Sequence, residues 1–525
     1  MGISFDTFLF LFPEAILVVT AAAIYVLGAA GLSRARWMPV AFSALLLAAW
    51  CAIRQPTDLA VGEAVLVDGL GQGIRWVAIL VGALFVIMSG REEGHQLTGE
   101  IFGSLLLIVV GTMLVGLAGD LVLLFLALEL ISIPTYVLLF LGSPGRASVE
   151  ATTKYFFLSI FSSCMLLYGF SLLYGLAGST SLAQIYGTLA AGQLAVGEVG
   201  QSLLTPLAFV MILAGIGFKI AAVPFHFYAP DVYQGTTSLN AGILAVFPKI
   251  AGMVALMRLI LVMSPVLGFW SWQTVMLLSL LTMTLGNVAA LWQTNIRRLL
   301  AYSSIAHTGY MLMGLVVALF SSRDVSADEG FSAMLLYLVV YAIASIGTFA
   351  ALGWLADSQG VVDRVSSLAG IGFRRPAAAA CVAIFMFSLA GIPPLAGFWG
   401  KFFLFWNTIS LGLSASFSSM SFCFIILAVV GVLNAAIGMG YYLRIIAIMY
   451  FPAEEAEQKQ IHSSPYWGSA LAMLICAALV LAVGIGPGRL MRETRDMARS
   501  AWIERAAEEN SDAGVLISRS FTSTK

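Results

Sequence analysis

The chain has 525 residues, of which 60% are hydrophobic and only 10% are charged, and its formal net charge is -1. Soluble domains carry about 25% charged residues, so this composition is that of a protein that crosses a membrane many times. Because the net charge is close to zero and no basic patch is interleaved with aromatic residues, nothing favours nucleic-acid binding.

Apolar runs of about 18 residues or more predict an all-α polytopic membrane protein with about fourteen transmembrane helices. The first run follows no basic segment and is long for a signal peptide, so we interpret it as a spanning helix. The predicted spans are 7–30, 37–53, 74–90, 100–117, 120–141, 152–177, 203–228, 238–263, 271–292, 299–320, 332–357, 377–409, 417–450 and 466–487.

The arginines and lysines of the short loops favour one orientation, with both termini on the outer, periplasmic side. With the N-terminus outside, the outer loops carry chiefly Arg54, Arg75 and Arg323. The inner loops then carry most of the basic residues, which are Arg34, Arg36, Arg91, Arg146, Arg297, Arg298, Arg364, Arg374, Arg375 and Lys459. The arginines of the tail after Gly488 run against this rule, but acidic neighbours weaken their effect.

Glu129 lies about nine residues into the fifth span, roughly 13 Å along a helix and so near the middle of the bilayer. Pro134 follows it and removes a backbone donor. Ionisable groups inside membranes are candidate functional groups by default, although a structural salt bridge between two helices is the alternative. Lys154, at the start of the sixth span, is a weaker candidate because a lysine there can extend to the membrane surface.

The segment Phe218 to Gly235 places Lys219, Pro224 and His226 inside what otherwise resembles a membrane-spanning helix. An ammonium group at mid-bilayer costs roughly 2.5–3.5 kcal/mol, and proline breaks the backbone hydrogen bonding, so the segment predicts an enclosed, hydrated site. Seven residues separate Lys219 and His226, so an unbroken helix would place both on one face. A carboxylate such as Glu129 stabilises the charged form of a lysine, and His226 suits a proton relay or, alternatively, a hydrogen-bonded core position.

Three further polar residues lie within later spans. Lys249, beside Pro248 in the eighth span, repeats the pattern of Lys219. His307 has Ser303, Ser304 and Thr308 as neighbours, so a hydrogen-bonded structural role competes with a role in proton relay. Lys401 follows a break at Gly391-Ile392-Pro393-Pro394 in the twelfth span, and its alternative is extension to the membrane surface.

Two broken spans five helices apart indicate an inverted repeat, because an odd offset makes equivalent helices run in opposite directions. The repeat would pair helices four to eight with helices nine to thirteen. It predicts N-terminal helices over 1–99, a first five-helix repeat over 100–263, a second over 271–450, and a last span with its tail over 466–525.

Four segments together resemble the antiporter-like membrane subunits of the proton-pumping NADH:quinone oxidoreductase, respiratory complex I. They are LALELISIPTYVL around Glu129, FKIAAVPFHFYAPDVYQG around Lys219, RRLLAYSSIAHTGYML around His307, and LAGIPPLAGFWGKFFLF around Lys401. PDVYQG and Lys249 are similar to the N branch of that family. The sequence departs from the usual pattern at Phe227-Tyr228 and at Thr236-Thr237-Ser238, which leaves the charged residues intact.

The resemblance implies a role for each matching residue. Glu129 would modulate the pump lysine Lys219, Lys249 would be the central relay, and Lys401 would face the exit or a neighbouring subunit, with His226 and His307 as accessory groups. It also implies a location in an energy-transducing membrane, the bacterial inner membrane, and partners that are other membrane subunits of complex I. NAD, FMN, iron–sulfur clusters and quinone would belong to partner subunits.

This chain is expected to hold no cofactor or metal itself. The sequence has no dinucleotide-binding glycine fingerprint, and its five cysteines, Cys51, Cys164, Cys381, Cys423 and Cys476, form no CxxC pair. A Na⁺/H⁺ antiporter subunit of the Mrp type is the alternative function, but a sodium site would require oxygen ligands, and Glu129 is the convincingly deep carboxylate. A haem-bearing quinol module would need paired axial ligands, for which His226 and His307 are the available intramembrane histidines.

Overall fold

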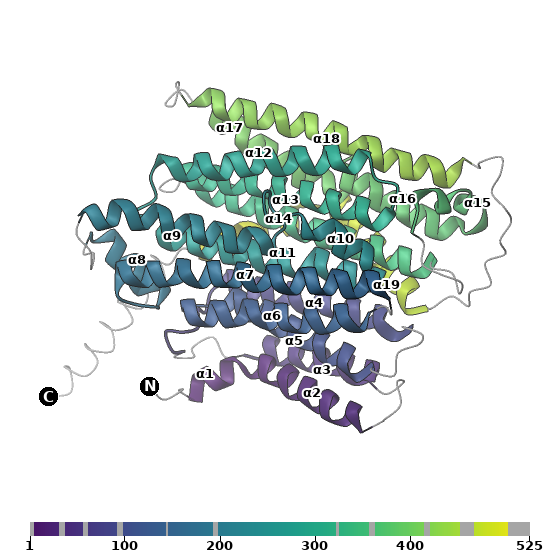
Figure 1. Ribbon diagram of the computed structural model, residues 1–525, viewed down its shortest axis with the longest axis horizontal. Coiled ribbons are helices and arrows are strands. Elements are labelled where there is room, and N and C mark those ends of the chain that lie inside the picture. Colours follow the sequence, from purple (N-terminus) through teal and green to yellow (C-terminus); the bar gives the residue numbers. More distant parts are fainter. Residues whose placement is uncertain are drawn as a thin grey trace.

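The computed structural model describes residues 5–30, 37–55, 61–91, 98–142, 145–192, 198–321, 325–355, 363–413, 420–451 and 467–501. These residues form α-helices that lie side by side along one common direction, with the N-terminal helices at one edge of the bundle and α17 and α18 at the other (Figure 1). Among the described residues the β-structure consists of three isolated bridges in connecting segments. The prediction of an all-α polytopic membrane protein is confirmed.

The first half of the chain contains helices α1 to α11. They are α1 (Phe5–Phe10), α2 (Phe12–Ala29), α3 (Trp37–Ile53), α4 (Gly69–Met88), α5 (Thr98–Leu117), α6 (Leu121–Leu141), α7 (Arg146–Ala177), α8 (Leu182–Ala190), α9 (Glu198–Lys219), α10 (Tyr228–Gly235) and α11 (Ser238–Met263). The second half contains α12 (Phe269–Leu291), α13 (Ile296–Phe320), α14 (Val325–Leu355), α15 (Ile371–Arg374), α16 (Pro376–Ala390), α17 (Ala396–Leu413), α18 (Ser421–Tyr450), α19 (Trp467–Ile485) and α20 (Gly488–Ser500).

Eleven of the helices in the described residues are long and apolar enough to cross a membrane. Three shorter apolar helices, Trp37–Ile53, Leu203–Lys219 and Pro376–Ala390, coincide with further predicted spans, and the last two are the first halves of broken ones. Helices such as α7 and α14 begin several residues before the predicted spans. Their first turns are polar, so hydropathy alone places the start of each helix too late.

Short polar side chains define where several helices begin. Asp68 accepts a hydrogen bond of 2.7 Å from the backbone NH of Gly71 at the start of α4, and Asp120 accepts one of 2.6 Å from Val122 at the start of α6. Asn295 caps α13 in the same way, with a hydrogen bond of 3.0 Å from the NH of Arg298. Such caps satisfy backbone donors that a helix start leaves without partners.

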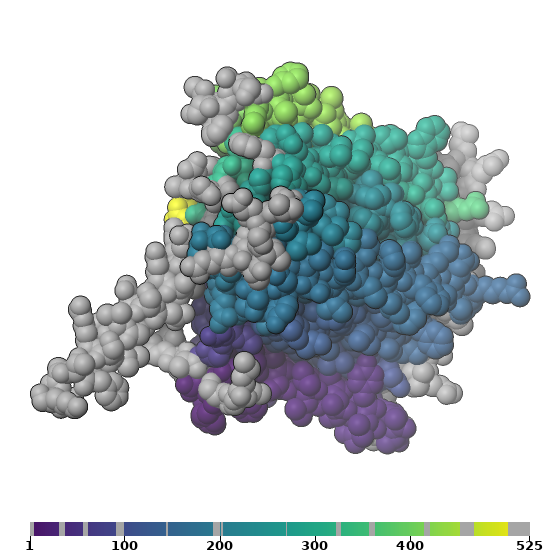
Figure 2. Space-filling view, turned by 60° about the vertical axis from the view of Figure 1, so that its left-hand side comes forward, coloured from purple at the N-terminus to yellow at the C-terminus, as the bar shows by residue number. Residues whose placement is uncertain are grey.

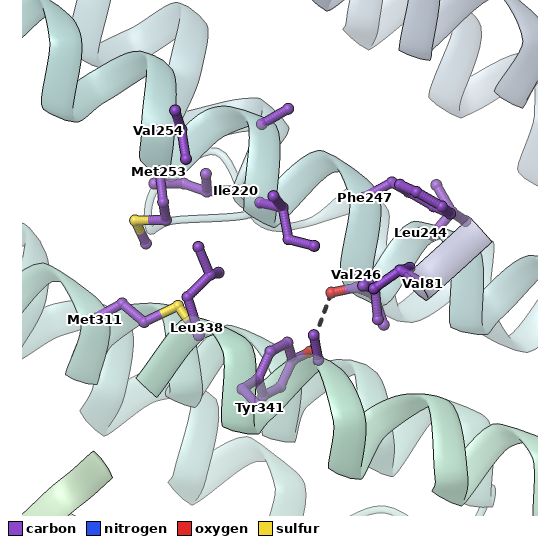
Figure 3. Packing of buried hydrophobic residues seen from close by; sticks show 14 of the residues in the cluster. Val81, Ile220, Leu244, Val246, Phe247, Met253, Val254, Met311, Leu338 and Tyr341 are labelled. Carbon is purple, nitrogen blue, oxygen red and sulfur yellow. Dashed lines mark hydrogen bonds between the residues drawn. The ribbon is translucent and has the colours of Figure 1, made fainter. Parts of the chain in front are cut away.

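The helices α11, α13 and α14 form the centre of the bundle, since nearly all of their residues are buried. Apolar side chains fill the space between them, including Met253 of α11, Met311 of α13 and Leu338 of α14 (Figure 3). Ile220, from the segment after α9, enters the same layer. A polar group within this layer therefore needs a hydrogen-bond partner.

Two buried arginines hold the N-terminal helices, one of them to each other and the other to this centre. Arg75 in α4 is fully buried and binds both carboxylate oxygens of Glu14 in α2, each at 2.7 Å. Arg258 in α11, also fully buried, pairs with Asp68 and donates a hydrogen bond of 2.7 Å to the carbonyl of Gly116. The prediction that Arg75 lies in an outer loop is wrong, because Glu14, 61 residues away, neutralises it inside the bundle.

Both predicted helix breaks are present. The helix α9 ends at Lys219, residues 220–227 are not helical, and the chain passes through Ala221 with a left-handed φ of 56° before α10 begins. The second break separates α16 from α17 and begins at Gly391, which has a φ of 90°. Each break leaves carbonyl groups at a helix C-terminus without intrahelical partners.

Several helices lie outside the predicted spans, namely α8, α15, α20 and all but the first residue of α10. The helix α20 begins directly after the last predicted span, at Gly488, in the tail that carries several arginines. The buried side of α20 carries Thr494, Met497 and Ala498, and the helix packs against α14 and α4. Arg34, Arg36, Arg323 and Lys459, which contributed to the predicted orientation, lie outside the described residues.

Candidate functional site

Glu129 and Lys219 form an ion pair between α6 and α9. The Lys219 Nζ lies 3.0 Å from Glu129 Oε1 and donates a second hydrogen bond of 2.9 Å to the hydroxyl of Ser132. The hydroxyl of Ser163 in α7 donates to the same carboxylate oxygen at 2.5 Å. The side chains of Lys219 and Glu129 are 6% and 19% exposed, so the carboxylate is the more exposed member of the pair.

His226 would share a helical face with Lys219 only in an unbroken helix, and the helix is broken between the two residues. Lys219 is the last residue of α9, and His226 lies in the non-helical segment, so the seven-residue spacing has no periodic meaning there. The imidazole is half-buried, and its Nδ1 is buried without a hydrogen-bond partner among the described residues. The structure thus leaves His226 apart from the contacts of the Glu129–Lys219 pair.

Lys249 binds the end of the broken helix α9. Its Nζ donates a hydrogen bond of 2.9 Å to the carbonyl of Ile220, the first residue after α9, and one of 2.7 Å to the hydroxyl of Thr308 in α13. The Thr308 hydroxyl donates to the same carbonyl at 2.8 Å. A cation at a helix C-terminus is stabilised both by the free carbonyls and by the helix dipole.

The packing around Ile220 holds this contact in place. A Cβ added at Gly252 would lie 2.4 Å from Ile220 Cγ2, so the absence of a side chain at Gly252 allows the segment to approach α11. Ile220, Met253 and Met311 are labelled together in Figure 3 as members of one apolar group. Lys249 is 2% exposed. Among the described residues its hydrogen-bond partners are two neutral oxygens, the Ile220 carbonyl and the Thr308 hydroxyl, and not a carboxylate.

His307 lies between two tyrosine hydroxyls. Its Nδ1 is 2.5 Å from the hydroxyl of Tyr337 in α14, and its Nε2 is 2.8 Å from that of Tyr442 in α18. Hydroxyls both donate and accept, and a neutral imidazole carries one donor and one acceptor. The three side chains can therefore exchange hydrogen-bond direction when a proton is added or removed.

A hydroxyl-lined cavity adjoins this region. The hydroxyl of Ser304 lies 2.7 Å from the hydroxyl of Tyr341. The Tyr341 hydroxyl also donates a hydrogen bond of 3.3 Å to the carbonyl of Ala245 in α11, drawn as a dashed line from Tyr341 in Figure 3. Ser304 and Tyr341 line a cavity of about 10 Å³ together with Ser303, Ser345 and Thr348. A polar cavity of about this size has room for a single water molecule.

Lys401 binds the second broken helix in the way that Lys249 binds the first. Its Nζ donates to the carbonyls of Leu389 and Ala390, the last residues of α16, at 2.9 and 3.0 Å. The same ammonium lies 5.0 Å from the centroid of the Tyr310 ring. Lys401 is 5% exposed, so it does not extend to the membrane surface. Each broken helix therefore ends on a lysine ammonium.

Lys154 is the candidate that the structure places at the surface. Its side chain is 42% exposed, and its Nζ lies 2.7 Å from Glu150 and 3.0 Å from Asp231 of α10. Asp231 also accepts a hydrogen bond of 2.6 Å from Arg298 of α13. This group of charged residues joins α7, α10 and α13 and is separate from the buried lysines.

Asp231 should contribute to stability in a pH-dependent way. Its helix α10 is not among the candidate spans. Burial raises the pKa of Asp231, but hydrogen bonds and charges from Lys154 and Arg298 outweigh burial, and the pKa is lower than usual. A lowered folded-state pKa stabilises the protein above the unfolded value of about 3.9 and ceases to do so as pH falls through the folded value.

We expect Asp231→Asn to lower the thermal midpoint of the purified protein by a constant amount between neutral pH and about pH 5. The difference from the native protein should shrink as the pH is brought towards 3 and below. Thermal unfolding followed by circular dichroism across this range measures it. A difference that is the same at all pH values would mean that the charge of Asp231 is not involved.

Several residues of this site were not predicted, among them Ser132, Ser163, Tyr310, Tyr337, Tyr341 and Tyr442. Each is a polar or aromatic residue within an apolar helix. Such residues are common in this chain, so residue type alone did not single them out. Tyr337 and Tyr341 lie one helical turn apart, and this spacing was the available signal that both face the interior. A group of three or more His, Cys, Asp or Glu side chains that could hold a metal ion is not found among the described residues.

Comparison with known proteins gives consistent matches. Residues 118–428 match the family described as NADH:quinone oxidoreductase/Mrp antiporter, TM. NADH-quinone oxidoreductase subunit N of Trichlorobacter lovleyi is 39% identical over 436 residues, covering 82% of this chain and 83% of the relative. The protein named NADH-quinone oxidoreductase subunit N 2 of Acidobacterium capsulatum is 35% identical over 508 residues, covering 91% of this chain and 97% of the relative.

Solved structures agree with these matches. A chain of respiratory complex I from Thermus thermophilus superimposes with a TM-score of 0.73 and 29% identity, covering 91% of this chain and 98% of that one. A chain of the Mrp complex from Dietzia sp. superimposes with a TM-score of 0.77 at 19% identity, covering 95% and 98%. At that identity the second likeness concerns the fold alone.

Proposed function

We propose that this chain moves protons across the membrane, because it belongs to the antiporter-like membrane subunits of NADH:quinone oxidoreductase, in the subunit N group. It is thus part of a translocase, respiratory complex I. The proton path is a buried relay of Glu129, Lys219, Lys249, His307 and Lys401. The observation that carries this proposal is that Lys249 and Lys401 each bind the end of a broken helix through neutral oxygens, without a carboxylate partner among the described residues.

The broken helices give the relay a way to respond to charge. A protonated lysine satisfies the free carbonyls at the end of α9 or α16, and a neutral lysine has one donor fewer and no charge to offer the helix dipole. Protonation and the position of the break are therefore coupled. Movement of either break, driven by redox chemistry elsewhere in the complex, would change how firmly its lysine holds a proton.

Proton transfer between the lysines requires intermediate groups. Thr308 contacts Lys249 and is adjacent in sequence to His307, whose ring nitrogens bind Tyr337 and Tyr442. The path from Lys219 to Lys249 and from His307 to Lys401 would be completed by water molecules, which bridge polar groups too far apart for direct hydrogen bonds. His226 has the accessory part, and its Nδ1 is buried without a hydrogen-bond partner among the described residues.

We further propose fourteen spans, with two inverted five-helix repeats over 100–263 and 271–450 between the N-terminal helices of 1–99 and the last span with its tail over 466–525. Support comes from the two breaks, each of which ends on a lysine. Both termini are proposed to lie on the periplasmic side of the membrane. Thr7 binds the backbone of Gly62, and Ser500 lies close to Gly69, which supports a common end of the bundle for α1 and α20.

In this arrangement Lys154, Asp231 and Arg298 lie at the inner end, where protons would enter. Lys154 is exposed, so its proposed part is limited to the entrance. Partner subunits would hold NAD, FMN, the iron–sulfur clusters and quinone. Purification in mild detergent tests this assignment: flavin and iron–sulfur subunits should copurify with the chain, and small antiporter subunits without redox centres would contradict it.

The charge of Glu129 should control the activity of the relay. In the assembled complex, we expect the rate of proton pumping to rank native, then Glu129→Asp, then Glu129→Gln, with the Gln variant below about a tenth of the native rate, equivalent to about 1.4 kcal/mol. Glutamine removes the charge that stabilises protonated Lys219, whereas aspartate keeps the charge at a shorter reach. Pumping is measured as acidification of vesicles that contain the complex.

Ser163→Ala is the matched control for this series. It removes the hydrogen bond to Glu129 Oε1 without changing any charge. We expect a smaller loss than for Glu129→Gln, because the ion pair with Lys219 remains. Native activity in the Gln variant would show that the carboxylate charge is irrelevant to pumping.

A further inference from the structure

A cavity at one end of the bundle lies between α14, α17 and α20. Its volume is about 140 Å³, and its polar lining residues include Glu329, Asn407 and Arg495. Its apolar wall includes Leu336, Phe403 and Trp406. Figure 2 turns this end of the molecule towards the reader, with the α17–α18 edge in green at the top and the N-terminal helices in purple at the bottom.

The cavity lies where the membrane-spanning helices reach the membrane surface. The last apolar span, α19, ends at Ile485, and the charged helix α20 follows directly, with Arg489, Arg492 and Arg495 exposed. Trp406 is 58% exposed, and tryptophan is enriched at the boundary between lipid and water. A salt bridge of 3.8 Å between Arg499 and Asp328 helps to hold α20 against α14.

Two opposite charges line the cavity without pairing. In the described part of the chain neither Glu329 nor Arg495 forms an ion pair, with the other or with a third residue. Both side chains are exposed. A charged side chain at the membrane boundary is stabilised by a charge of opposite sign. A ligand that carries one cation and one anion a few bonds apart would therefore pair with both Glu329 and Arg495.

We propose that this cavity binds the headgroup of a phosphatidylethanolamine molecule. The phosphate diester binds the Arg495 guanidinium, whose planar donors suit phosphate oxygens, and the primary ammonium binds the Glu329 carboxylate. Phosphatidylglycerol lacks the cation. Phosphatidylcholine has a quaternary ammonium that cannot donate a hydrogen bond. Charge therefore distinguishes phosphatidylethanolamine from phosphatidylglycerol, and hydrogen-bond donation to Glu329 distinguishes it from phosphatidylcholine.

An apolar surface next to the cavity suits the acyl chains. Phe402 is 38% exposed and stacks on Trp406, with ring centroids 6.0 Å apart and an interplanar angle of 20°. Phe398 stacks on Phe402 in turn, at 5.7 Å. This row of rings runs along α17 from the cavity towards the break before Ala396, which is the direction from the membrane surface into the bilayer.

Quenching of Trp406 fluorescence by brominated lipids tests the proposal on the full chain in phosphatidylcholine vesicles. The chain has 11 tryptophans, so the fluorescence of Trp406 is obtained as the difference in fluorescence between the native protein and the Trp406→Phe variant. Brominated phosphatidylethanolamine should quench the Trp406 fluorescence about two- to fivefold more effectively than brominated phosphatidylglycerol, as expected for accessible ion pairs. Trp292, which is 81% exposed at the end of α12, is the control and should show no such preference when the native protein is compared with Trp292→Phe.

Two variants separate the two charges. Glu329→Gln removes the group that recognises the ammonium, so the preference for phosphatidylethanolamine should disappear. Arg495→Gln removes the group that recognises the phosphate, so quenching of Trp406 by both lipids should fall. Equal quenching by the two lipids in the native protein would overturn the proposal. So would the absence of quenching of Trp406 by either lipid, because a protein segment would then fill the cavity.

Discussion

Lys219→Ala is expected to abolish proton pumping and the quinone reduction coupled to it, while the complex still assembles. The substitution removes the ammonium that binds Glu129 at 3.0 Å and Ser132 at 2.9 Å, and no other described side chain occupies that position. We expect pumping below about a hundredth of the native rate, equivalent to about 2.7 kcal/mol of barrier. Vesicle acidification and NADH oxidation measure the two activities, and subunit composition measures assembly.

Lys219→Arg distinguishes a group that exchanges protons from a fixed charge. Arginine keeps the ion pair with Glu129 but stays protonated at all accessible pH values. The Arg variant should therefore assemble as well as the native protein and still fail to pump. Full pumping by an assembled Lys219→Ala or Lys219→Arg complex would exclude proton exchange at this position.

Lys249→Gln should also strongly reduce pumping, to below about a tenth of the native rate. Glutamine is chosen because its amide can still donate hydrogen bonds to the carbonyl of Ile220 and to Thr308, which the Lys249 Nζ binds at 2.9 and 2.7 Å. A leucine would remove both of these hydrogen bonds, leave the Ile220 carbonyl to Thr308, and confuse loss of stability with loss of function. Rapid acidification measurements on the assembled complex give the rate.

Thr308→Val tests the connection between Lys249 and the rest of the line. Valine has nearly the same shape as threonine but removes the hydroxyl that binds both Lys249 and the Ile220 carbonyl. A smaller reduction than in Lys249→Gln is expected, because the Nζ keeps its bond to Ile220. Native pumping in Lys249→Gln would remove Lys249 from the relay and leave the Glu129–Lys219 pair as the proposed site.

The helices and both breaks were predictable because they depend on neighbouring residues. Long apolar runs define the spans, and proline and glycine at Pro224 and Gly391 interrupt backbone hydrogen bonding locally. The pairing of Glu129 with Lys219 followed from matched depth and opposite charge. These features depend on hydropathy and on distance along a helix, and both are properties of one segment at a time.

The partners of the central residues were not predictable in the same way. Lys249 contacts Ile220 and Thr308, which are 29 and 59 residues away, and His307 contacts Tyr337 and Tyr442 on two other helices. Helical periodicity shows which side chains share a face but not which helix that face meets.

Arg75 and His226 show where predictions from a single segment fail. Hydropathy placed Arg75 outside because a lone arginine is costly in a bilayer, whereas Glu14 on another helix makes its burial possible. Helical spacing would place His226 on the same face as Lys219 in an unbroken helix, but the helix ends between them. The residue pattern thus identifies the helices, the breaks and the buried charges, and packing between distant helices determines which neutral oxygens, tyrosines and carboxylates each charge meets, because those contacts form only when the helices assemble.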